Sequence, residues 1–133
     1  MRTKPSLTLA DVKKMLAACE AKAGENKWAV AISIVDEGGY LLGFTRMDGC
    51  AAISAEVSLG KARTSALTKR PSKFFEDRVK ERPAFVTFPT PGVMFQGGLP
   101  LMHQGECVGA IGVSGVQSHE DEQVAQAGVA VLG

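Results

Sequence analysis

The sequence predicts an α+β fold in which helices pack on the faces of one antiparallel sheet. Two β-hairpin patterns, in residues 28–47 and 99–114, supply the strands. Apolar residues at helical spacing before, between and after these hairpins supply the helices. Because amphipathic helices must bury one face, this order of elements predicts a sheet with helices on its faces.

The first helix is predicted in "SLTLADVKKMLAACEAKAGEN", residues 6–26. Thr8 followed by Asp11 three positions later resembles a capping box, and Gly24 is typical of a helix terminator. One face is apolar at helical spacing and consists of Val12, Met15, Leu16 and Cys19. The pattern indicates a helix that packs on the sheet.

The first hairpin follows this helix directly. "WAVAISIV" (residues 28–35) is rich in β-branched residues and predicts a strand. The glycines of residues 36–39 predict the turn, and "YLLGFTRM" (residues 40–47) predicts the returning strand.

Two helices and a loop separate the hairpins. The small residues of a predicted helix over residues 51–70 indicate close packing on the sheet or on another subunit, and Pro71 ends that helix. "SKFFEDRVKER" (residues 72–82) predicts a short amphipathic helix. The prolines and glycines of residues 83–98 predict an irregular loop with a functional or oligomeric role.

The second hairpin is predicted at residues 99–114, with its turn at Gln104 and Gly105. "CVGAIGVSG" (residues 107–115) is apolar on both faces, so it predicts a central strand whose glycines allow close approach of another backbone or of a ligand. A C-terminal helix follows, with Ser118 as its N-cap.

Length and composition indicate one soluble domain over residues 1–133. The net charge of +1, from 15 basic and 14 acidic residues, gives no reason to expect a nucleic-acid or anionic-membrane partner. No apolar run is long enough to span a bilayer and the N-terminus lacks a secretory pattern, so a cytoplasmic location is predicted.

Cys19 and Cys107 lie in apolar stretches typical of a core, whereas Cys50 follows a glycine at an element boundary.

Four segments together resemble the GlcG/HbpS family, also called the haem-degrading domain family. They are "AISIVDEGGYLLGFTRMDG", "SLGKARTSA", "QGGLPLMHQGECVGAIGVSG" and "EDEQVAQAG". The chain is also similar to a domain that follows the adenosyltransferase part of some cobalamin enzymes. The resemblance implies a profilin-like α/β/α sandwich, homo-oligomers, and a haem-binding or redox-linked accessory role in pathways that degrade small organic compounds.

The resemblance implies haem as a cofactor, but one ligand of the family pattern is missing. Haem-binding members use a histidine in or near the first helix as an axial ligand. The predicted first helix here has no histidine, so the sequence predicts weak haem binding at best, and not through that helix. His103 beside a hairpin turn, His119 in a first helical turn and Cys19 are the weak candidates for a metal ligand.

Five residues are the candidate ligand-binding set: Arg46, Asp48, Lys61, Gly97 and Gly98. Arg46 can hold a carboxylate through two N–H groups, Asp48 can orient it, and the backbone amides of Gly97 and Gly98 can donate to an anion. We expect Arg46 and Asp48 to face a cleft between the start of the second helix and this glycine pair.

Each of these residues also has a purely structural interpretation. Asp48 can form a turn through its own backbone while Arg46 is an edge charge. Lys61 can pair with Glu56 or Glu76 on a solvated face. The two glycines can form a tight turn without binding anything.

Three functions therefore remain open from the sequence. The chain is a homo-oligomeric binding module for haem, another tetrapyrrole or a related small molecule; or an enzyme acting on a small organic acid through Arg46, Asp48 and Lys61; or a structural oligomer.

Overall fold

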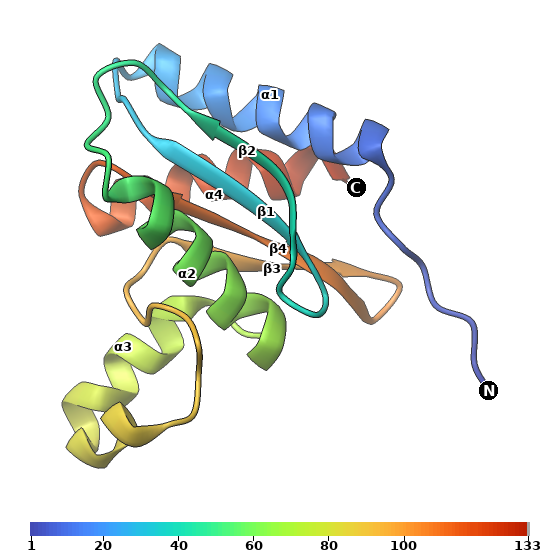
Figure 1. The fold of residues 1–133 in the computed structure, drawn as a ribbon, viewed down its shortest axis with the longest axis vertical. Coiled ribbons are helices and arrows are strands. Elements are labelled where there is room, and N and C mark those ends of the chain that lie inside the picture. The colour runs from blue at the N-terminus through green and yellow to red at the C-terminus, as the bar shows by residue number, and fades with distance from the viewer. Residues whose placement is uncertain (133) are drawn as a thin grey trace.

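Four antiparallel strands form one sheet, and helices cover both of its faces (Figure 1). The computed structural model describes residues 1–132. The elements in chain order are α1 (Leu9–Glu25), β1 (Ala31–Asp36), β2 (Leu41–Arg46), α2 (Ser54–Thr68), α3 (Ser72–Glu81), the 3-10 helix η1 (Pro83–Thr87), β3 (Gly98–His103), β4 (Glu106–Ser114) and α4 (Ser118–Leu132). The strand order is β2–β1–β4–β3. The predicted α/β/α sandwich is confirmed.

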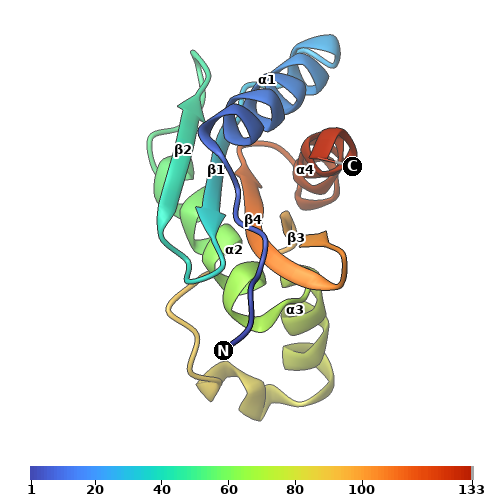
Figure 2. The same ribbon diagram turned by 90° about the vertical axis from the view of Figure 1, so that its right-hand side faces the viewer.

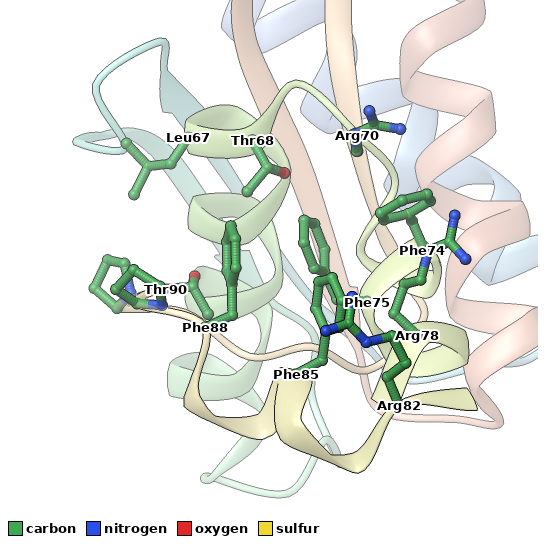
Figure 3. A pocket seen from close by; sticks show the side chains of 12 residues that line it. Leu67, Thr68, Arg70, Phe74, Phe75, Arg78, Arg82, Phe85, Phe88 and Thr90 are labelled. Carbon is green, nitrogen blue, oxygen red and sulfur yellow. The ribbon is translucent and has the colours of Figure 1, made fainter. Parts of the chain in front are cut away.

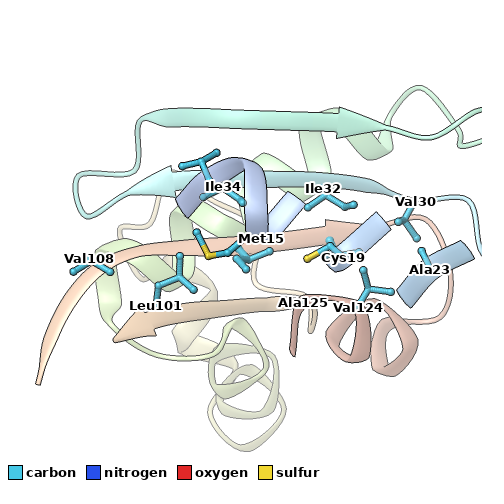
Figure 4. Packing of buried hydrophobic residues seen from close by; sticks show 13 residues of the cluster. Met15, Cys19, Ala23, Val30, Ile32, Ile34, Leu101, Val108, Val124 and Ala125 are labelled. Carbon is cyan, nitrogen blue, oxygen red and sulfur yellow. The ribbon is translucent and has the colours of Figure 1, made fainter. Parts of the chain in front are cut away.

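Helices α1 and α4 lie together on one face of the sheet (Figure 2). The predicted capping box begins α1: Asp11 N donates to Thr8 Oγ1, and Thr8 N donates to Asp11 Oδ2. The buried stripe of α1 packs against the sheet and α4 (Figure 4). This apolar core consists of Val12, Met15, Cys19, Ala23, Val30, Ile32, Ile34, Leu101, Val108, Ile111, Val113, Val124 and Ala125.

Helix α2 covers the opposite face, where small residues let it approach the sheet closely. A Cβ atom at Gly112 of β4 would collide with the carbonyl oxygen of Ser58 and with the backbone and side chain of Ala62. The Ser58 and Ser33 hydroxyls are hydrogen-bonded at 2.7 Å across this interface. The glycine and the small helical residues thus serve helix–sheet packing within one chain.

The second hairpin matches its prediction. Gln104 and Gly105 have positive φ angles of 51° and 79°, as expected for a tight hairpin turn. Strand β4 lies between β1 and β3, and eight of its nine residues are buried. Cys107 is buried there, as Cys19 is in α1, while Cys50 is half-buried.

Several predicted boundaries differ from the structure, three of them most clearly. Strand β1 begins at Ala31 and not at residue 28, because Trp28 N donates to Ala23 O and closes the end of α1. Helix α2 begins at Ser54, after a turn in which Ser54 N donates to Ala51 O. Residues 83–98 are not wholly irregular, since they begin with η1.

Candidate functional site

The Phe–Arg hollow is a cavity of about 730 Å³ between the end of α2, α3 and the segment around η1 (Figure 3). Its lining is aromatic and cationic: Leu67, Thr68, Arg70, Phe74, Phe75, Arg78, Arg82, Phe85, Phe88, Pro89, Thr90 and Pro91. Small-molecule sites typically enclose roughly 300–1,000 Å³. The cavity therefore has room for a small organic ligand.

Two prolines shape the walls of this hollow. Pro71 precedes the first residue of α3 and separates it from α2. Pro83 ends α3, because the residue before a proline avoids helical angles, and Arg82 indeed has φ −136° and ψ 92°. Pro83 then begins η1, so the chain turns back, η1 packs against α3, and both contribute side chains to the lining of the cavity.

Four phenylalanines from these walls pack together. The rings of Phe85 and Phe88 are stacked, with centroids 5.9 Å apart and planes 18° apart. Phe75 lies behind them with its centroid 5.1 Å from that of Phe88, and it is only 3% exposed. Phe74 contacts Phe75 edge-on at 5.2 Å. The buried ring anchors the cluster, while Phe88 remains 38% exposed and available to a ligand.

Three guanidinium groups border the aromatic cluster. Arg70 and Arg78 lie over the ring of Phe74, at 4.3 and 4.8 Å from its centroid, and Arg82 lies 5.5 Å from the centroid of Phe85. In Figure 3, Arg70 and Arg78 lie at the Phe74 side of the hollow, and Leu67 lies at the opposite side. Two guanidiniums therefore lie at one side of the hollow, whereas that of Arg82 lies against Phe85.

Only part of this positive charge is neutralised by carboxylates. Arg78 forms an ion pair with Glu81 at 2.9 Å. Within residues 1–132, neither Arg70 nor Arg82 has a carboxylate within 4.0 Å. Such a site favours an anionic ligand with an aromatic or apolar body.

Arg46 and Asp48 line a different cavity. This second hollow, of about 530 Å³, is bordered by α1 through Ala17, Glu20, Ala21 and Gly24. The lining of this hollow holds two carboxylates, of Glu20 and Asp48, and one guanidinium, of Arg46, a charge balance that does not favour an anion. The binding role of Arg46 and Asp48 stays a prediction.

The structure does not bring the five candidate residues into one cleft. Arg46 ends β2 and Gly98 begins β3, and these strands are the opposite edges of the sheet. Three strand spacings correspond to about 14 Å. Gly98 N donates to Ser72 Oγ at 2.9 Å, and Val113 N donates to Gly97 O at 3.0 Å. The glycine pair lies inside the protein, in contact with α2 and β4.

Lys61 is buried, so the structural alternative in which it pairs with Glu56 or Glu76 on a solvated face is wrong. Its Nζ donates to Asp121 Oδ2 at 3.0 Å and to Val113 O at 2.9 Å. The ion pair joins α2 on one face of the sheet to α4 on the other, passing beside Gly97. Burial raises the pKa of Asp121 despite the nearby ammonium group.

The three weak metal-ligand candidates lie apart from one another. Cys19 is fully buried in the core, and burial raises the pKa of its thiol to about 12. His103 ends β3 and His119 lies in the first turn of α4, both exposed. In the part of the chain that the structure describes, no three His, Cys, Asp or Glu side chains lie together as a metal site.

The described helices also include none that is long and apolar enough to cross a membrane.

Sequence reasoning missed the Phe–Arg hollow, although the sequence carries a signal for it. Arg70, Phe74, Arg78 and Arg82 recur at intervals of four residues. This spacing places side chains on one face of a helix. Cations and an aromatic residue on one face, followed by Phe85 in η1 and Phe88 directly after it, could have indicated a site in residues 70–88.

Comparisons with known proteins agree with the fold. A family model described as haem degrading protein HbpS-like matches residues 7–130. The chain is 44% identical over 115 residues to protein GlcG of Escherichia coli strain K12, covering 86% of this chain and 85% of GlcG.

Solved structures extend this similarity. A crystal structure of a Streptomyces reticuli HbpS double mutant matches 100% of this chain and 91% of its own, with a TM-score of 0.91 and 31% identity. A PduOC–haem complex matches 95% of this chain and 94% of its own, with a TM-score of 0.87 and 26% identity. With this agreement of sequence and fold over nearly its whole length, the chain belongs to the HbpS-like family of haem-degrading proteins.

Proposed function

We propose that this protein is a homo-oligomeric accessory protein that binds haem or a related tetrapyrrole in the Phe–Arg hollow. The observation that carries the proposal is the combination of four phenylalanines and three arginines in one cavity of about 730 Å³. The names of the relatives support the class of ligand: one family description refers to haem, and one similar structure is a haem complex.

The chemistry of the hollow fits the body of a tetrapyrrole. The macrocycle is flat and aromatic, and phenyl rings such as those of Phe85 and Phe88 form stacked or edge-on contacts with it. The propionate groups leave one edge of the ring, and guanidinium groups bind carboxylates through paired N–H donors. A flat ligand that carries acidic groups thus matches the aromatic and cationic lining of the hollow.

The residues of the hollow fit the iron of haem less well than they fit the macrocycle and its carboxylates. Its lining contains only Leu, Thr, Arg, Phe and Pro. Histidine, cysteine, methionine and tyrosine are the usual axial ligands of haem iron. The residues therefore fit the ring and the carboxylates but supply no axial side chain, in line with the missing histidine of α1.

Haemin is expected to bind with a dissociation constant of about 1 μM or weaker, because contacts to the ring and carboxylates act without ligation of the iron. An absorbance titration measures this value through the Soret band. A nanomolar complex with the sharp Soret band of two axial side-chain ligands would contradict this expectation.

Arg46→Ala is the matched control, since Arg46 is an exposed arginine outside the Phe–Arg hollow. Its haemin affinity is expected to equal that of the unmodified protein. Loss of binding in this variant would instead place the ligand at the α1 hollow and support the alternative of an organic-acid site. Absence of haemin binding by the unmodified protein would leave the structural oligomer as the better hypothesis.

The protein is expected to be a homo-oligomer, with a mass by light scattering that is a multiple of 14.0 kDa. Large apolar side chains are exposed at the edge strand β2 and between the start of η1 and β3: Tyr40 73% directly before β2, Leu41 52% and Phe44 39% in β2, Val86 70% in η1, and Phe95 58% in the segment before β3. Monomers rarely leave such surfaces open to water. A monomeric mass at micromolar concentration would contradict this expectation.

A further inference from the structure

The side chains that line the Phe–Arg hollow offer a ligand only rings, methyl and methylene groups, hydroxyls and guanidiniums. None of these groups coordinates iron well. The two histidines lie on other elements: His119 lies in the first turn of α4, on the opposite face of the sheet from α2, and His103 lines a small cavity with Leu7, Asp11 and Leu132. The centre of a bound macrocycle would therefore meet no metal ligand from this chain.

The positive charge of the hollow that no carboxylate neutralises matches a ligand with two acidic groups. Arg78 is already paired with Glu81, whereas Arg70 and Arg82 have no carboxylate partner among the described residues. Two unpaired guanidiniums correspond in number to the two propionates of protoporphyrin. The carboxylates of the ligand, and not its metal, meet the charged groups of the site.

The aromatic contacts to the ligand likewise do not depend on its central metal. Phe85 and Phe88 offer stacked rings, and the buried Phe75 holds Phe88 in position from behind. Stacking and edge-on contacts depend on the flat π-system of the ligand. A metal-free macrocycle presents the same flat surface as a metallated one.

Resting on the proposed function, we infer that the hollow recognises the class of dicarboxylate porphyrins through ring and carboxylates and does not discriminate by the central metal. The protein would then hold metal-free porphyrin as well as haem. This is the property of a tetrapyrrole carrier that accepts ligands before and after metal insertion.

The test is a series of calorimetric titrations of the full chain in one buffer with protoporphyrin IX, zinc protoporphyrin IX, haemin and protoporphyrin IX dimethyl ester. The first three are expected to bind with dissociation constants within about threefold of one another. The dimethyl ester is expected to bind at least about tenfold more weakly, because its carboxylates are masked.

The outcomes separate this inference from the proposed function. Haemin binding more than tenfold tighter than protoporphyrin IX would overturn the inference alone and would indicate an iron ligand, for example from a second copy of the chain. Equal binding of the ester and the free acid would overturn the role given to Arg70 and Arg82. Failure of all four compounds to bind would overturn the proposed function itself, and the inference with it.

Discussion

Lys61→Met is expected to lower the free energy of unfolding by about 3–5 kcal/mol. The side chains of Lys61 and Asp121 are each 3% exposed, and the ammonium group of Lys61 lies 3.0 Å from the carboxylate of Asp121. Methionine has a similar length but no charge, so the variant leaves Asp121 buried without its cation and Val113 O without its donor. Urea denaturation at pH 7 measures the change.

The pH dependence of this variant follows from the pKa of Asp121. Burial already raises this pKa in the folded protein, so ionisation of Asp121 opposes folding. Without Lys61 the pKa rises further. A group with a raised folded pKa favours folding while it is protonated, and this contribution is lost as the pH rises through the folded pKa. The deficit of Lys61→Met is therefore expected to be larger at pH 7 than at pH 5.

The double variant Lys61→Met with Asp121→Asn is the control for this interpretation. Asparagine keeps an oxygen that accepts from Val116 N, as Asp121 Oδ1 does at 3.1 Å, but it buries no charge. Most of the lost stability is expected to return. A deficit below about 1 kcal/mol in the single variant would show that the ion pair does not hold α2 and α4 together.

Replacing Arg70, Arg78 and Arg82 together by glutamine is expected to weaken porphyrin binding roughly 30-fold, or about 2 kcal/mol. Each arginine contributes donors at the rim of the Phe–Arg hollow, and glutamine retains bulk without charge. All three side chains are partly or fully exposed, so the melting temperature is expected to change little. Fluorescence titration with protoporphyrin IX measures the affinity.

The corresponding triple lysine variant separates charge from geometry. Lysine keeps the positive charge but lacks the planar pair of N–H donors. Its affinity is expected to lie between those of the glutamine variant and the unmodified protein. If the glutamine variant binds protoporphyrin as tightly as the unmodified protein, the arginines of the hollow serve only their contacts with Phe74, Phe85 and Glu81.

Local patterns in the sequence were sufficient for most of the fold. The Thr8–Asp11 capping box, the Gln104–Gly105 turn and the apolar run of β4 each depend on residues close together in the chain. Boundaries were less predictable. Residues 51–53 have side chains that are compatible with a helix, but they form a turn. The chain must change direction after β2 ends at the sheet edge, before α2 can begin.

The sites were harder to predict than the fold, because their partners are distant in sequence. Lys61 and Asp121 are 60 positions apart, and nothing near Lys61 indicates that it crosses to α4 beside Gly97. The Phe–Arg hollow depends on η1 returning toward α3 after Pro83, a change of direction that helical periodicity cannot show.

The most direct test of a tetrapyrrole site in the Phe–Arg hollow is a crystal structure of the protein with haemin, with the iron located by anomalous diffraction. We expect an iron peak inside the hollow, beside Phe85 and Phe88, with the propionates toward Arg70 and Arg82. An iron peak at the hollow that Arg46 and Asp48 share with α1, or at His103 or His119, would contradict it.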